Sequence, residues 1–101
     1  MSALKINNEN FESVISGERP VLIDFYADWC GPCKMMAPII EELASEAPYA
    51  AVGKVNVDDC PELARKFKIY SIPTLVVIKN GAEIQRAVGV RTKEALLDMI
   101  G

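Results

Sequence analysis

The stretch VLIDFYADWCGPCKMM (residues 21–36) places two cysteines three positions apart, with Gly31 and Pro32 between them. An apolar, β-branched and aromatic run precedes the pair, which indicates a strand covered on both faces, as in a parallel sheet. After the pair, Pro32 suits a first helical turn, and apolar side chains recur at helical spacing. The sequence therefore predicts a strand, then a turn that carries Cys30 and Cys33, then a helix.

Four explanations compete for such a cysteine pair: a structural crosslink, half of a metal site, two packed side chains, or a working redox pair. A crosslink that closes a loop of about 4 residues contributes only roughly 2 kcal/mol, and geometric strain subtracts from it. Zinc usually takes four Cys or His ligands, whereas the chain has no histidine and only Cys60 beyond the pair. A three-cysteine site completed by a carboxylate and a pair of merely packed thiols stay open as alternatives.

The expected position of the pair at a helix N-terminus favours redox chemistry. Unpaired N–H groups and the positive end of the helix dipole lower the pKa of a thiol there, so Cys30 is the better thiolate. Cys30 is also expected to be exposed to solvent. Cys33 lies one turn further on the same face. We expect Cys30 to attack a substrate disulfide and Cys33 to resolve the mixed disulfide, with no metal.

Composition limits the class of protein. A chain of 101 residues is one domain (1–101), half hydrophobic and a quarter charged, as in globular proteins. The net charge of −3 argues against nucleic acid or an anionic membrane as a partner. No apolar run is long enough to span a membrane, MSALKINNEN shows no signal-peptide pattern, and an odd cysteine count fits a disulfide framework poorly. We expect a cytoplasmic protein, where thiols are kept reduced, and a monomer.

The middle of the chain completes a strand–helix–strand unit. The run AAVGKVNV (50–57) indicates a second buried strand, so residues 21–57 form a βαβ unit. DDCPELARKF (58–67) predicts a short helix with Asp59 or Cys60 at its cap.

The remaining segments add a hairpin and two helices. TLVVIKNGAEIQRAVG (74–89) is typical of a hairpin that turns at Asn80-Gly81, Thr92 can cap a last helix, and an N-terminal helix is expected over about residues 8–16. Together these elements predict an α/β fold, with a mixed sheet of four or five strands and helices on both faces.

The segments VLIDFYADWCGPCK, KVNVD, SIPTLVVIKNG and VG resemble the thioredoxin family in order and spacing over nearly the whole chain. The resemblance implies the thioredoxin fold and a general protein-disulfide reductase that acts by dithiol-disulfide exchange and carries electrons. It implies disulfide-containing client proteins, a thioredoxin reductase that recycles the protein, and no cofactor beyond its own disulfide. The alternatives are a reductase dedicated to one client and a non-catalytic binding subunit or scaffold in which the thiols are incidental.

The resemblance assigns catalytic roles residue by residue. Cys30 resembles the attacking cysteine and Cys33 the resolving one. Asp24 resembles the buried carboxylate that handles the proton of the resolving thiol, and Lys54 the lysine that lies near it. A solvent-facing carboxylate on an edge strand is the alternative for Asp24, and an ordinary surface charge is the alternative for Lys54.

Further positions match the substrate-binding surface of the family. Pro73 matches the cis-proline beside the disulfide, although an ordinary trans proline is also tolerated at a strand start. Trp29 is expected to be an exposed contact residue, with a place in the core as the alternative. The full set is Trp29, Gly31, Pro32, Ile72, Pro73, Gly89 and Val90.

Two residues depart from the pattern or lie outside it. Tyr26 stands where many thioredoxins have tryptophan, which changes a packing partner but not the thiol chemistry. Cys60 lies outside the motif and is expected to be a small side chain, buried or near a helix cap, while a regulatory role remains open.

Overall fold

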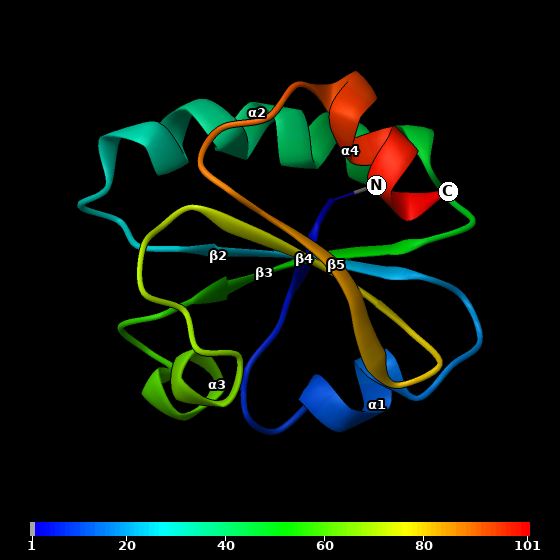
Figure 1. Ribbon diagram of the computed structural model, residues 1–101, viewed down its shortest axis with the longest axis horizontal. Coiled ribbons are helices and arrows are strands. Elements are labelled where there is room, and N and C mark those ends of the chain that lie inside the picture. Colours follow the sequence, from blue (N-terminus) through cyan, green and yellow to red (C-terminus); the bar gives the residue numbers. More distant parts are fainter. Residues whose placement is uncertain (1) are drawn as a thin grey trace.

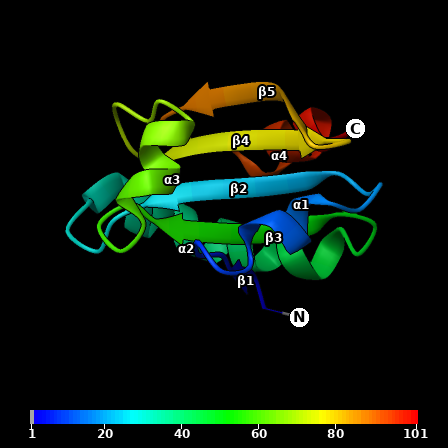
Figure 2. The same ribbon diagram turned by 90° about the horizontal axis from the view of Figure 1, so that it is seen from below.

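A sheet with the strand order β1-β3-β2-β4-β5 forms the middle layer of the molecule (Figures 1 and 2). The structure is a computed structural model that describes residues 2–101. In chain order the elements of this part are β1 (Leu4–Lys5), α1 (Phe11–Ile15), β2 (Val21–Tyr26), α2 (Gly31–Glu46), β3 (Ala51–Asn56), α3 (Pro61–Lys66), β4 (Thr74–Lys79), β5 (Ala82–Val88) and α4 (Lys93–Ile100).

The sheet is mixed, as the sequence predicted. β2 pairs in parallel with β3 and antiparallel with β4, while β3 pairs in parallel with β1 and β4 antiparallel with β5. Helix α2 connects β2 to β3, which confirms the βαβ unit. The carboxyl end of β2 leads into the cysteine pair, so the most central strand positions the site.

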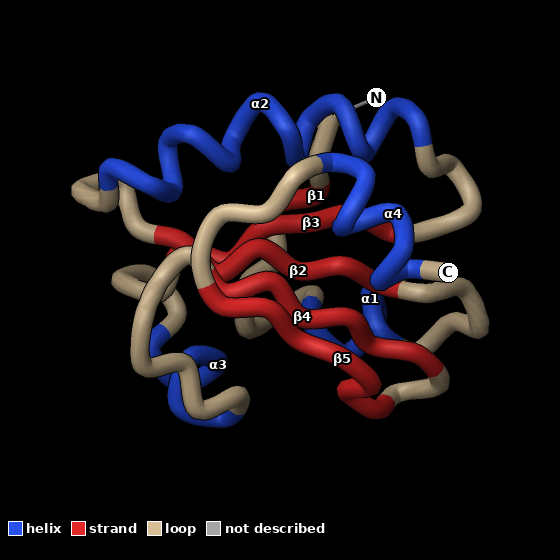
Figure 3. Tube along the Cα trace, turned by 45° about the horizontal axis from the view of Figure 1, so that its top comes forward, coloured by secondary structure: helices blue, strands red, loops and turns tan. Residues whose placement is uncertain are grey.

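Helices cover both faces of the sheet, with α2 and α4 on one side and α1 and α3 on the other (Figures 1 and 3). Successive side chains of a strand point to opposite faces. Accordingly Val21, Ile23 and Phe25 of β2 belong to the core that includes α1 and α3, and Leu22 to the core that includes α2 and α4. The same alternation directs Asp24 into the α2 side. Within residues 2–101 no helix is both long and apolar enough to cross a membrane.

The hairpin and the last helix form as predicted. Asn80 and Gly81, at the turn between β4 and β5, have φ angles of 53° and 79°. Both angles are positive, as the tight hairpin turn requires and as Asn-Gly tolerates. The hydroxyl of Thr92 accepts the N–H of Ala95 at 3.1 Å and caps α4.

The N-terminal segment differs from the prediction in two respects. The expected helix over 8–16 is wrong in extent, because α1 has only five residues. The Asn7 side chain accepts the N–H groups of Glu9 and Asn10, both at 3.0 Å, and so holds this segment in a turn. The second difference is β1, which sequence analysis did not identify.

Strand β1 depends on a glycine in its neighbour. Leu4 pairs with Gly53 of β3, and Ile6 donates its N–H to the Lys54 carbonyl at 2.9 Å. A Cβ on Gly53 would lie 2.5 Å from Ile6 Cδ1 and 3.0 Å from the Leu4 carbonyl oxygen. The missing side chain therefore lets the N-terminal segment pack closely against β3.

Candidate active site

The cysteine pair lies at the start of α2, as predicted. Cys30 is the N-cap residue, and its sulfur accepts the N–H of Cys33 at 3.2 Å. The two cysteines form a disulfide with a Cα–Cα distance of 5.2 Å. A sulfur that accepts a helix N–H is placed where a thiolate is stabilised, because the N-terminal N–H groups have no partner within the helix.

The pair is more deeply buried than expected. The exposed site that the sequence predicted for Cys30 is wrong, because this residue is only 5% exposed, and Cys33 is 4% exposed. The disulfide packs with Ala27 against Tyr26, Val57 and Ile72. Cys30 Sγ lies 3.8 Å from the Ile72 carbonyl oxygen, so a segment 42 residues further along the chain covers it.

The segments that the sequence assigned to substrate binding meet beside the disulfide. The Ile72–Pro73 peptide bond is cis. Gly89 donates its N–H to the Pro73 carbonyl at 2.8 Å and has a φ of 94°, a conformation that favours glycine. Val90 follows and is partly exposed. The structure therefore brings residues 72–73 and 89–90 together.

Trp29 is a surface residue. Its side chain is 71% exposed, so the alternative of a core position is wrong. The indole Nε1–H donates to Asp58 Oδ2 at 2.8 Å, which orients the ring. Gly31 and Pro32 are also exposed, in the first turn of α2. These three residues present a surface next to the buried disulfide.

Asp24 is buried, and the alternative of a solvent-facing carboxylate is wrong. It is 3% exposed, and within residues 2–101 its Oδ1 atom has no hydrogen-bond partner. Burial raises its pKa from 3.8 to about 7, and the positive charge of Lys54 opposes that rise. The carboxyl group can therefore exchange a proton near neutral pH.

Lys54 is adjacent to Asp24, because the two residues are paired in the register of β3 and β2. Its Nζ lies 3.7 Å from Glu41 Oε2 and 5.9 Å from the centroid of the Tyr26 ring. The side chain is 37% exposed, so it is partly a surface charge as well. Lys54 and Cys33 line the same hollow of about 250 Å³, which connects the resolving cysteine with the lysine.

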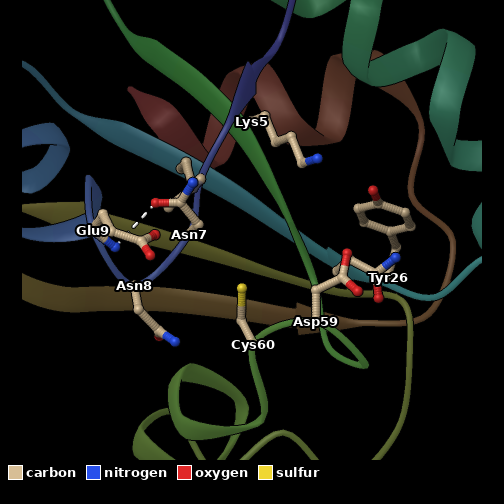
Figure 4. A pocket seen from close by; sticks show the side chains of 9 residues that line it. Lys5, Asn7, Asn8, Glu9, Tyr26, Asp59 and Cys60 are labelled. Atoms are coloured by element: carbon tan, nitrogen blue, oxygen red, sulfur yellow. Dashed lines mark hydrogen bonds between the residues drawn. The ribbon is translucent and has the colours of Figure 1, made fainter.

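Cys60 lies apart from the disulfide. It is 4% exposed and is the N-cap residue of α3, which confirms a buried side chain near a cap. Figure 4 shows it between Asn8 and Asp59, at a hollow of about 210 Å³. Burial, and to a smaller extent the charges of Asp59, Glu9 and Glu62, raise the pKa of its thiol.

Sequence reasoning missed three residues near the site. Glu41 reaches Lys54 from α2, Asp58 orients Trp29, and Tyr70 lines a groove with Trp29 and Ile72. Glu41 lies on a predicted helix, but its approach to Lys54 depends on how α2 packs against β3, which the sequence pattern does not show. Tyr70 is an isolated aromatic residue in a loop, and no periodic pattern marks it.

A disulfide at a helix N-terminus, which follows the strand that carries a buried carboxyl group with a pKa of about 7, can form and break by thiol exchange. Fold and site together define a protein-disulfide oxidoreductase.

Comparisons with known proteins specify the family. The family model described as Thioredoxin matches residues 2–101. A thioredoxin of Chlamydia pneumoniae is 46% identical over 94% of this chain and 92% of its own length. A thioredoxin of Mycobacterium tuberculosis is 48% identical over 95% of this chain and 84% of its own. The structure of a mutant thioredoxin from Halobacterium salinarum has a TM-score of 0.92 and 39% identity, covering 98% of this chain and 88% of that one. The chain belongs to the thioredoxin family.

Proposed function

We propose that the protein is a general protein-disulfide reductase of the cytoplasm, a monomeric electron carrier that a thioredoxin reductase recycles. Its only redox group is the Cys30–Cys33 disulfide, and it needs no further cofactor. The observation that carries the proposal is the position of Cys30, whose sulfur accepts a helix N–H while bonded to Cys33.

The reaction consists of two exchanges. In the first, the Cys30 thiolate attacks one sulfur of the client disulfide, and the second client sulfur leaves as a thiolate that takes up a proton. In the second, the Cys33 thiolate attacks Cys30 Sγ and releases the first client sulfur as a thiolate. Two electrons pass to the client, and the protein is left with its own disulfide.

Asp24 and Lys54 serve the second exchange. Cys33 must lose its proton before it can attack, and a carboxylate with a pKa of about 7 is well matched to accept that proton at neutral pH. Lys54 stabilises the charged form of Asp24 and lines the hollow beside Cys33. Burial and Lys54 together thus determine what fraction of Asp24 is ionised at a given pH.

The client approaches over the exposed surface beside the disulfide. Trp29, Gly31 and Pro32 form one side of this surface, and Ile72, Gly89 and Val90 form the other, while Pro73 itself is buried. Ile72 offers backbone groups to an extended client strand, in the manner of peptide addition to a strand edge.

The test traps the intermediate. Cys33→Ser retains the attacking thiol and removes the resolving one, so disulfide-linked adducts between the protein and its clients should accumulate on non-reducing gels of a lysate pull-down. Cys30→Ser is the matched control and should give at most a trace. In parallel, the wild-type protein should reduce insulin disulfides in the presence of NADPH and a thioredoxin reductase.

Two results would contradict the proposal. An equally strong ladder with Cys30→Ser would mean that the attacking role is misassigned. Absence of adducts from both variants, together with no insulin reduction by the wild type, would favour a binding subunit in which the thiols are incidental.

A further inference from the structure

Tyr70 separates two grooves on the surface near the disulfide. It is 90% exposed, the largest exposed fraction among the large hydrophobic side chains of residues 2–101. The first groove, here the disulfide groove, is lined by Trp29, Val57, Ile69, Tyr70, Ser71 and Ile72. The second, here the α3 groove, is lined by Ala64, Arg65, Lys68, Ile69 and Tyr70.

The two grooves are adjacent, and the disulfide groove reaches the active site. Ile72 lines the disulfide groove, and its carbonyl oxygen lies 3.8 Å from Cys30 Sγ. Ile69 and Tyr70 line both grooves. A polypeptide that places a sulfur against Cys30 and runs through the disulfide groove therefore meets Tyr70 and then the α3 groove.

The far end of this surface carries two positive charges without an ion-pair partner in residues 2–101, although Arg65 lies near enough to Glu62 to help lower the pKa of that carboxyl group. Four basic side chains lie in this region, and two of them are paired: Lys66 with Glu12 at 3.6 Å, and Arg86 with Glu83. Arg65 and Lys68 are exposed, and neither makes an ion pair within residues 2–101.

The near end has the opposite charge. Asp58 binds the Trp29 indole, and Asp28 is exposed immediately before Trp29. The surface therefore changes from acidic beside Trp29 to basic beside Arg65, in a chain whose net charge is −3. Two exposed aromatic side chains and an open arginine are also the residue types enriched in protein interfaces.

We propose that the α3 groove is an extended binding site for client polypeptides, which selects segments with acidic side chains beyond the cysteine that Cys30 attacks. Tyr70 packs against the client backbone, while Arg65 and Lys68 pair with its carboxylates. The inference rests on the proposed reductase function and adds a substrate preference to it. Complementary charge at such an edge acts mainly on the rate of encounter and on the choice of partner.

The test uses three synthetic peptides with the same disulfide, which differ only in the segment that follows one cysteine: three glutamates, three glutamines or three lysines. The second-order rate constant for reduction by the pre-reduced protein is measured at low salt and in 1 M salt. We expect the glutamate peptide to react about three-fold faster than the glutamine peptide at low salt, as two exposed ion pairs allow, and the lysine peptide to react more slowly. Salt should remove the difference.

Variants test whether the difference between the peptides arises at Arg65 and Lys68. The double variant Arg65→Glu with Lys68→Glu should invert the ratio of the glutamate to the lysine rate constant. Arg19→Glu with Lys79→Glu is the matched control, since it changes the net charge equally at the opposite end of the sheet, where β2 begins and β4 ends. Its ratio should stay close to that of the wild type. Tyr70→Ala should slow all three peptides by a similar factor.

The outcomes separate this inference from the function on which it rests. Wild-type reduction of all three peptides at equal rates, or a ratio that shifts as much in the control as in the α3-groove variant, overturns the binding site and leaves the reductase intact. If the wild type reduces neither the peptides nor hydroxyethyl disulfide, the reductase function fails and the binding site fails with it.

Discussion

The starts of α2 and α3 are two versions of the same local arrangement. Each helix follows a parallel strand, each has a cysteine as its N-cap residue, and each has a proline in its first turn. Cys30 accepts an N–H from the helix and is bonded to Cys33. Cys60 makes no side-chain capping bond and is a free thiol.

The difference lies in what surrounds each sulfur. Helix α2 has 16 residues and α3 only six. Three positions after Cys60 the chain has Leu63, a buried core residue, where α2 has its second thiol. Burial, and to a smaller extent nearby acidic residues, raise the pKa of the Cys60 thiol, whereas the strand that leads into the other cysteine pair carries a buried carboxyl group with a pKa of about 7. A cysteine at a helix start is therefore not sufficient for redox activity.

The largest expected difference between the two helix starts is in thiol reactivity. In the reduced protein at pH 7, Cys30 should react with iodoacetamide several hundredfold faster than Cys60. The helix N–H groups favour the thiolate of Cys30, while burial and neighbouring acids disfavour that of Cys60. Mass-spectrometric mapping after limited labelling measures the order. If Cys60 is modified first, the comparison between the two helix starts is wrong.

Sequence analysis predicted the features that depend on local sequence patterns. The apolar neighbours Ile23 and Phe25 indicated that Asp24 is buried, and the helical spacing after Pro32 indicated α2. It failed where distant segments decide the outcome. The two exposed residues of β1 show no pattern, and they lie close to β3 at Gly53, which has no side chain in the way.

The local environment of the site shows the same limit. The burial of Cys30 depends on Ile72, which lies far along the chain, and the groove that Tyr70 shares with Trp29 and Val57 likewise joins segments distant in sequence. The helix expected over 8–16 was too long because the side-chain hydrogen bonds of Asn7 compete with helical ones. Local propensity thus predicted the helices and strands, while tertiary contacts determined how accessible the sulfur of Cys30 is.

The second prediction concerns the buried carboxyl group of Asp24, which belongs to the arrangement at the start of α2. Asp24→Asn keeps the shape without the charge and should raise the free energy of unfolding at pH 8 by about 2 kcal/mol. A rise in pKa from 3.8 to about 7 corresponds to roughly 4 kcal/mol, but the buried amide retains part of the desolvation cost. Urea melts of the two proteins measure the difference.

The pH dependence of that gain follows from linkage. Between 3.8 and about 7 the unfolded carboxyl group is ionised while the folded one holds its proton, so wild-type stability falls as pH rises through this interval. The gain of the variant should accordingly vanish below pH 4 and level off above pH 7. The same variant should resolve mixed disulfides more slowly. An Asn variant that is less stable at pH 8 than the wild type would mean that the Asp24 charge is not penalised by burial.

The smallest effect is expected at the second helix start. Cys60→Ala removes one sulfur atom from the core that includes Phe11 and Phe25, and should lower the free energy of unfolding by about 1 kcal/mol. Its rate of insulin reduction should stay within about two-fold of the wild type, because Cys60 belongs to the opposite core from Asp24 and lies outside the cluster around the disulfide. Urea melts and insulin turnover, measured on the same preparation, give both values. A loss of turnover greater than five-fold with unchanged stability would place Cys60 in the redox pathway. Both helix starts would then contribute to the redox reaction, and the contrast between them would be one of rate alone.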